Sequence, residues 1–241
     1  GLLQVLYNAG ITTELFPCLI FIGIGAMTDF RVLFQNPRMV FFGAAAQFGI
    51  FFTIIAVLAV SKLFPGIGFT FLEAASIGII GAADGPTSIV VANALAPSLL
   101  GPITVVAYSY MSLVPIIQPP VIRAITTKKE RMIRMEYVDT KVKKVVLIIF
   151  PIAVTIISAI LAPISAPLIG LLMFGNLIKE SGVVERLNKS AQNELTNIVT
   201  LLLGITIGAT MRYTEFLQVK TLVILALGLV AFVFDTIGGV M

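Results

Sequence analysis

The stretch that decides the fold is residues 69–100, which read FTFLEAASIGIIGAADGPTSIVVANALAPSLL. Two apolar runs flank Asp84-Gly85-Pro86 at its centre. Pro86 has no backbone N–H, and the residue before a proline is pushed away from helical geometry. We therefore predict two half-helices that meet at Asp84. The second begins near Thr87, with Asp84 or Pro86 at its cap.

The rest of the chain is unusually apolar. Of its 241 residues, 58% are hydrophobic and only 12% are charged, and the mean hydropathy is +1.06. A soluble domain is about 45–50% apolar and about 25% charged. Long apolar runs with few charges are typical of chains that lie in lipid. The composition therefore predicts an all-α polytopic membrane protein.

Residue usage also excludes several kinds of chemistry. The chain has no histidine and no tryptophan, and its single cysteine is Cys18. An internal disulfide framework, a four-cysteine metal site and a His-ligated metal are therefore excluded. Proton transfer has to use Asp, Glu, Tyr, Lys or water. The net charge of +4 comes mostly from one loop, which indicates membrane orientation and not nucleic-acid binding.

The other apolar segments are interrupted in different ways. Leu15–Met27 is short and predicts a half-span or a tilted helix, whereas Met39–Val60 is long enough to cross the membrane. Ile103–Ile122 contains three prolines and is expected to be broken. Arg123–Lys144 is rich in Lys and Arg and is expected to be a cytoplasmic loop. The later apolar runs are Val145–Leu161, Pro167–Ile178, Ile198–Met211 and Leu222–Phe234.

Two short segments resemble each other. Leu19–Phe30 reads LIFIGIGAMTDF and Leu202–Tyr213 reads LLGITIGATMRY, and the next span of each copy begins with a base, Arg38 or Lys220. Transporters are often built from two inverted repeats with broken helices. We predict a transporter-like bundle of this kind, incomplete at both ends. Its parts would be a first repeat at 1–122, a basic loop at 123–144 and the start of a second repeat at 145–241.

Asp84 is the candidate ion-binding residue. A carboxylate in the bilayer costs about 2.5–3.5 kcal/mol on insertion scales, so it needs a partner, an ion or water. Thr87 and Ser88 add hydroxyls beside it, and oxygen ligands with one negative charge suit Na⁺ or H⁺. The alternative is that Asp84 only caps a half-helix and pairs with an interior base. Tyr110 and Asn176 are further candidate ligands, although for Asn176 an interhelical hydrogen bond is the favoured interpretation.

Three motifs carry a resemblance to a known family. They are GAADGPT at 81–87, AYSYMSLVPIIQPP at 107–120 and TTKKERMIRMEY at 126–137. With them, the chain resembles the beta subunit of the biotin-dependent, sodium-translocating decarboxylases, which act on oxaloacetate, methylmalonyl-CoA or glutaconyl-CoA. The resemblance implies a subunit of the bacterial cytoplasmic (inner) membrane that decarboxylates carboxybiotin, consumes a proton and exports Na⁺. It also implies that Asp84 and Tyr110 are the residues that carry out this chemistry.

The resemblance further implies what the subunit works with. Biotin would be held by a carrier subunit, and a carboxyltransferase alpha subunit, a small gamma or delta membrane subunit, lipid and further copies of the membrane subunit would complete the assembly, without nucleic acid. The family has a later Asn-Pro motif and earlier spans that this chain lacks, so half of the ion site is expected to lie beyond Met241. The rival interpretations are a sodium-coupled carrier of an organic anion and a purely structural membrane subunit.

Overall fold

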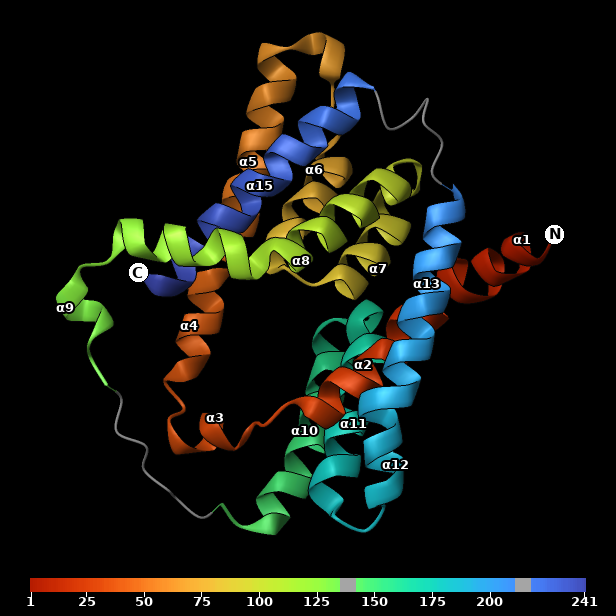
Figure 1. Ribbon diagram of the computed structural model, residues 1–241, viewed down its shortest axis with the longest axis vertical. Coiled ribbons are helices and arrows are strands. Elements are labelled where there is room, and N and C mark those ends of the chain that lie inside the picture. The colour runs from red at the N-terminus through yellow and green to blue at the C-terminus, as the bar shows by residue number, and fades with distance from the viewer. Residues whose placement is uncertain (135–141, 211–217) are drawn as a thin grey trace. The chain divides into compact units, whose positions relative to one another are not determined.

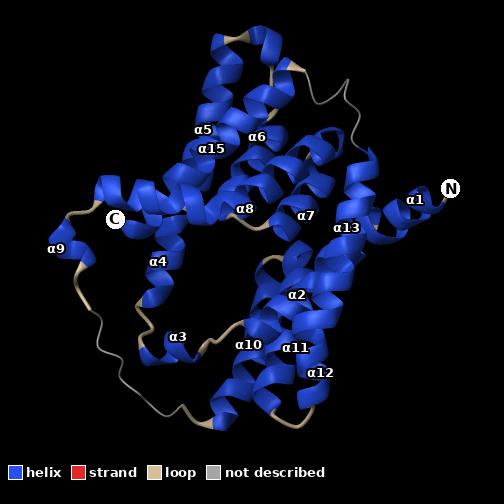
Figure 2. Ribbon diagram, viewed as in Figure 1, coloured by secondary structure: helices blue, strands red, loops and turns tan. Residues whose placement is uncertain are grey.

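The structure is a computed structural model that describes residues 1–134, 142–210 and 218–241. Within these ranges every regular element is helical, and no strand is found (Figure 2). This confirms the predicted all-α class. The chain divides into two compact units, one formed by residues 1–37 and 138–209 and the other by residues 38–137 and 210–241.

The helices of each unit come from separate parts of the chain (Figure 1). The first unit contains α1 (Leu2–Leu6), α2 (Leu15–Met27), α3 (Arg31–Gln35), α10 (Lys144–Leu161), α11 (Ala166–Ser181), α12 (Glu185–Ser190) and α13 (Thr196–Thr210). The second contains α4 (Met39–Ala46), α5 (Phe48–Leu63), α6 (Phe71–Gly78), α7 (Gly85–Leu95), α8 (Leu100–Ile125), α9 (Lys128–Arg131) and α15 (Val219–Val240). The two similar segments of the predicted repeat begin in α2 and α13, in the same unit, and the spans that follow them both fall in the other; residues 211–213 of the second segment lie outside the described residues. The repeat itself and its boundaries stay a prediction.

Several helices are long enough to cross a membrane. Among the described residues, three helices are long and apolar enough: Met39–Leu63, with 25 residues, α10 with 18 and α15 with 22. About 20 residues at a rise of about 1.5 Å each span the hydrocarbon core. Two bent helix pairs raise the number to five if each pair is counted as one span: Leu2–Thr12 with Leu15–Met27, bent by 58°, and Pro97–Met111 with Leu113–Ile125, bent by 65° between Met111 and Leu113 of α8. The structure therefore confirms a multi-pass membrane protein.

The prolines of α8 bend the helix but do not end it. The prolines were expected to break the segment, but the helix continues through Pro115, Pro119 and Pro120 to Ile125. A proline inside a helix removes one hydrogen bond and clashes with the carbonyl of the preceding turn, which kinks the helix. Pro115 lacks the N–H that would bond to the carbonyl of Met111, and the helix bends directly after Met111.

The first unit is held together where two helices cross at glycines. A Cβ on Gly25 of α2 would overlap the carbonyl oxygen of Leu172 in α11, and a Cβ on Gly175 would overlap that of Ile22. Small residues at such crossings let helix backbones approach closely in a membrane. The two glycines therefore fix α2 against α11 in one register.

In the second unit α15 packs against the elements around it. Its backbone at Asp235 touches Gly49 of α5, and its Gly228 faces Val106 of α8. The ring of Phe234 stacks on Phe52 with centroids 3.9 Å apart. The α15 helix therefore lies beside both the long span of this unit and the broken segment described below.

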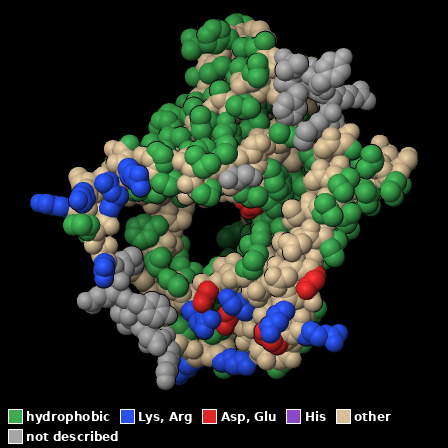
Figure 3. Space-filling view, in the orientation of Figure 1, with side chains coloured by type: hydrophobic (Ala, Val, Ile, Leu, Met, Phe, Trp, Pro, Cys, Tyr) green, Lys and Arg blue, Asp and Glu red, His purple; other side chains and the backbone are tan. Residues whose placement is uncertain are grey.

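Charged side chains gather at helix ends. In the view of Figure 3, hydrophobic side chains cover much of the visible surface, while Lys and Arg gather over the end of α8 and over α9. The basic residues there are Arg123, Lys128, Lys129 and Arg131. Of the predicted loop, Glu136, Asp139 and Lys141 lie outside the described residues. The cytoplasmic side of this loop stays a prediction from its charge.

Candidate functional site

The predicted break at Asp84 is present. The first half-helix, α6, starts with a capping box between Thr70 and Glu73 and continues into a 3-10 turn at Ile79–Ala82. Ala83 then adopts a left-handed conformation with φ 54°, which a residue with a Cβ rarely adopts. This reverses the chain direction, so that Asp84 is extended and becomes the N-cap of α7.

The oxygen atoms at this break lie close together. The Thr87 hydroxyl donates to Asp84 Oδ2 at 2.6 Å, and the Thr87 N–H lies 3.5 Å from Oδ1. The Ser88 hydroxyl, fully buried, donates to the Asp84 carbonyl at 2.9 Å. The structure thus brings together three of the five candidate ligand residues, Asp84, Thr87 and Ser88. A carboxylate, a carbonyl and two hydroxyls are the kinds of ligand that hard cations bind.

The Asp84 carboxylate has no basic partner among the residues that the structure describes. The ion pairs found there join Arg31 to Asp29, Lys189 to Glu185 and Lys220 to Glu73. A group of His, Cys, Asp or Glu side chains sufficient for a transition metal is also missing from the described ranges. The interior ion pair that the simple capping alternative required is therefore not found in these ranges.

Two tyrosines of α8 lie on different faces of the helix. Tyr110 is buried, and its hydroxyl donates to the carbonyl of Leu225 in α15 at 2.6 Å. Tyr108 instead packs its ring against Gly85, the residue that follows Asp84. Residues two apart in a helix are rotated by more than half a turn about the helix axis. Only one of these two tyrosines can therefore face the break.

Sequence reasoning selected Tyr110 and passed over Tyr108. The structure places Tyr108 beside the break, while the proposed proton-handling role of Tyr110 stays a prediction. The missing information was the rotation of α8 about its axis relative to α7. The prolines of α8 obscured the helical period that would have given that rotation.

Asn176 lies in the first unit, on α11. It is 1% exposed, and its amide donates to the carbonyls of Gly25 at 3.5 Å and Thr28 at 3.1 Å. Lys179 donates to the same Thr28 carbonyl at 2.9 Å. These bonds satisfy the last carbonyls of α2. Its contacts are those of the interhelical alternative, and ion ligation by Asn176 stays a prediction.

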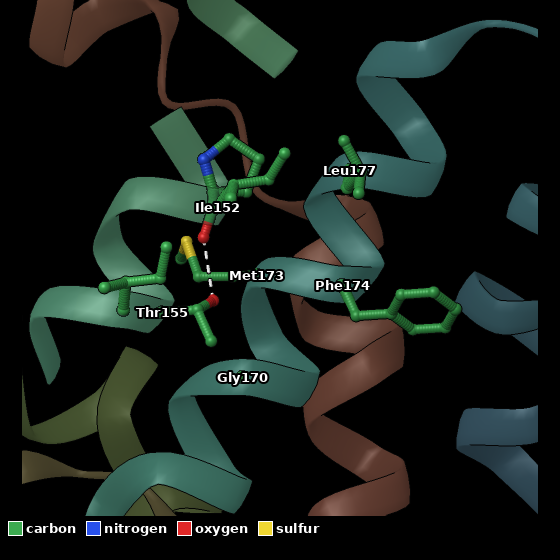
Figure 4. A pocket seen from close by; sticks show the side chains of 8 residues that line it. Ile152, Thr155, Gly170, Met173, Phe174 and Leu177 are labelled. Carbon is green, nitrogen blue, oxygen red and sulfur yellow. Dashed lines mark hydrogen bonds between the residues drawn. The ribbon is translucent and has the colours of Figure 1, made fainter. Parts of the chain in front are cut away.

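One pocket of the first unit is unsuited to an ion (Figure 4). It has a volume of about 230 Å³ and lies between α10 and α11. Its walls are almost entirely apolar, and the hydroxyl of Thr155 is already donated to the carbonyl of Pro151 at 2.7 Å. A cation in this pocket would lack oxygen ligands.

Comparison with known proteins identifies the family. The profile described as "Na+-transporting oxaloacetate decarboxylase beta subunit" matches residues 1–241. The oxaloacetate decarboxylase beta chain of Klebsiella pneumoniae is 52% identical over 241 residues, covering the whole chain and 55% of that protein. The methylmalonyl-CoA decarboxylase subunit beta of Propionigenium modestum is 53% identical over 241 residues and is covered to 59%. The same subunit of Veillonella parvula is 52% identical over 238 residues.

The chain spans little more than half the length of these relatives. The match nevertheless extends from its first residue to its last, through both half-helices and the α8 segment. Together with the apolar spans, it places the chain as a multi-pass protein of the bacterial inner membrane. The chain therefore belongs to the family of the beta subunits of sodium-transporting oxaloacetate decarboxylases.

Proposed function

We propose that the protein is the membrane subunit of a decarboxylase sodium pump, which decarboxylates carboxybiotin and exports Na⁺ while consuming a proton. The observation that carries this proposal is the carboxylate of Asp84 at a helix break within an apolar segment. It has hydroxyl and carbonyl oxygens around it and no basic partner in the part of the chain that the structure describes. Membership of the family supports the decarboxylase chemistry.

In this proposal Na⁺ is the cargo. Asp84 supplies the negative charge, and the hydroxyls of Thr87 and Ser88 supply neutral ligands. Asn176 and Tyr110 are proposed to complete the pathway. Because the carboxylate already sits at the N-terminus of α7, its position is set before the ion arrives, which lowers the cost of binding.

The chemical step must balance a proton. Breaking the bond between the ureido nitrogen and the carboxyl carbon releases CO₂ and leaves the electron pair on nitrogen, so the nitrogen takes up one proton. The chain has no histidine to supply it. Asp84 in its protonated form, or Tyr110, is proposed to relay the proton. Exchange of Na⁺ for H⁺ at Asp84 would then release Na⁺ on the far side.

The partners follow from the same proposal. A biotin carrier subunit delivers the carboxyl group, and a carboxyltransferase alpha subunit loads it. A small gamma or delta membrane subunit and further copies of this subunit complete the assembly. The exposed basic residues of α9 offer a surface for docking of the carrier.

The test uses the full-length subunit with its partner subunits in proteoliposomes. Asp84→Asn keeps the size of the side chain but removes the charge, and it is expected to abolish both Na⁺-dependent decarboxylation and Na⁺ uptake. Asp29→Asn is the matched control, because Asp29 is exposed and pairs with Arg31 outside the apolar spans. If Asp84→Asn pumps Na⁺ like the wild type, the proposal fails.

Avidin separates this proposal from the sodium-coupled carrier. Blocking biotin should stop Na⁺ transport by a decarboxylase pump, whereas a carrier of an organic anion needs no biotin. Avidin-insensitive Na⁺ transport would therefore favour the carrier. A structural subunit would instead tolerate replacement of Asp84.

A further inference from the structure

A second carboxylate lies within an apolar span of the second unit. Asp235 is part of α15, a 22-residue helix that is long and apolar enough to cross a membrane. Ionisable residues inside such spans are costly and are kept where they bind ions, protons or partners. Asp235 is therefore a candidate for function, although the proposal above does not use it.

Close packing fixes the position of Asp235. The long span Met39–Leu63 is interrupted at Gln47, where α4 ends and α5 begins. Gly49, in the first turn of α5, touches the backbone of Asp235 without room for a side chain. The carboxylate accepts a hydrogen bond from the backbone N–H of Ile50. It therefore sits at the positive end of the α5 helix dipole, which favours a negative charge.

One oxygen of this carboxylate has no partner. Asp235 Oδ1 is buried and makes no hydrogen bond within the described residues. Glu73, another carboxylate of the same unit, shows the contrast: Lys220 lies 2.8 Å from its Oε1, and the Thr70 N–H donates to its Oε2 at 2.7 Å. A buried charge without a counterion is costly, so Asp235 calls for a cation or a proton.

A cavity of about 330 Å³, with a lining that is mainly apolar but includes Asp235, Gln118 and Thr236, lies at this residue. Ala82 and Ala83, which immediately precede Asp84, form part of its wall. Gln118 and Thr236 also line the cavity; the Thr236 hydroxyl donates to the carbonyl of Phe232 at 2.9 Å, which leaves lone pairs of its oxygen for a cation, as the amide oxygen of Gln118 does. Since a water molecule occupies about 30 Å³ of liquid, the volume suits an ion that keeps part of its hydration shell.

We propose that Asp235 and Gln118 bind a partly hydrated Na⁺ in this cavity, as a second cation site next to the break that carries Asp84. Thr236 adds a neutral oxygen ligand. The choice of Na⁺ as the ion rests on the proposed function. Ala82 and Ala83, the last residues before Asp84, separate this cavity from the Asp84 site. An ion that enters or leaves the Asp84 site would bind here transiently.

The experiment measures equilibrium binding of ²²Na⁺ to the purified full-length subunit, without carboxybiotin. Wild type is expected to bind Na⁺ at two classes of site. Asp235→Asn should weaken one class by about tenfold or more, as loss of a charged ligand does, and Asp84→Asn should weaken the other. Asp29→Asn should bind like the wild type. Unchanged binding by Asp235→Asn would overturn the inference.

Further variants keep the test decisive if Asp235→Asn does not fold. Gln118→Leu removes an oxygen from the cavity wall and is expected to weaken the same class of site about threefold to tenfold, the size of one neutral polar contact. Asp235→Glu retains the charge and should retain that class. If Gln118→Leu binds like wild type, the cavity is not a Na⁺ site.

The result can be told apart from failure of the proposed function. Binding of ²²Na⁺ needs no decarboxylation, so an Asp235-dependent site would still be seen in a subunit that does not pump. Conversely, a functional pump whose Na⁺ binding and Na⁺ dependence ignore Asp235→Asn would refute this inference alone.

Discussion

Replacement of Gly85 by alanine should disturb the proposed ion site at Asp84 through a single methyl group. Gly85 is the first residue of α7 and follows Asp84 directly. A Cβ at this position would lie 2.5 Å from the Tyr108 ring, and ordinary van der Waals contact begins at 3.4 Å. The ring and the start of α7 must therefore separate by about 0.9 Å. This shift costs free energy because both pack on buried neighbours.

The size of the effect follows from this overlap. Overpacking a buried position costs about 1–3 kcal/mol, which we expect as the loss in free energy of unfolding. Moving the N-terminus of α7 also moves the Asp84 cap, so the half-saturating Na⁺ concentration should rise. The measurements are equilibrium unfolding of the full-length subunit in detergent, followed by circular dichroism, and Na⁺ titration of decarboxylation.

Two comparisons make the reasoning refutable. Gly43→Ala adds the same methyl group in α4, where nothing lies within 4 Å, and should be neutral or slightly stabilising. In a Tyr108→Ala background the clash disappears, so adding Gly85→Ala should cost no further stability. If Gly85→Ala is no more destabilising than Gly43→Ala, the close approach of Tyr108 to the break is refuted.

Two further predictions concern charged groups. Lys220→Met should lower the free energy of unfolding by about 1–2 kcal/mol, because it leaves the Glu73 carboxylate at the start of α6 without its ion-pair partner. Lys220→Arg keeps the positive charge and should largely retain stability. Equal stability of the two variants would contradict this prediction. The N–H and hydroxyl of Thr127 donate to Glu130 and hold the pKa of that carboxyl below its usual range, so the cap of α9 is stabilised at neutral pH and loses this contribution as the pH falls through the lowered pKa. Thr127→Ala should raise the pKa of Glu130, measured by carbon NMR titration, and an unchanged pKa would refute the hydroxyl's part in it.

The break at Asp84 could be predicted because its cause is local. Pro86 removes a donor and constrains the residue before it, and Asp84 is a strong N-cap residue. The helix boundaries observed there, α6 with its 3-10 extension and α7 from Gly85, follow from these properties. Thr87 and Ser88 fall beside Asp84 for the same reason, as members of the first turn.

What depended on contacts between distant segments could not be predicted. Asp235 was missed because the apolar run seemed to end at Phe234, so the residue looked like a boundary; α15 in fact continues to Val240. The pair Gly238-Gly239 read as the end of a helix, but these two glycines pack closely against Ala45 and Ala46. Such close approaches depend on how α15 is rotated toward α4, which no short-range pattern records.

The glycine crossing of α2 and α11 limits how the first unit can rearrange. A slide of either helix by one position would push a side chain into the backbone now opposite Gly25 or Gly175. The amide of Asn176 adds a hydrogen bond to the carbonyl of Thr28, at the end of α2. Any rearrangement of this unit that keeps this packing would therefore move α2 and α11 together.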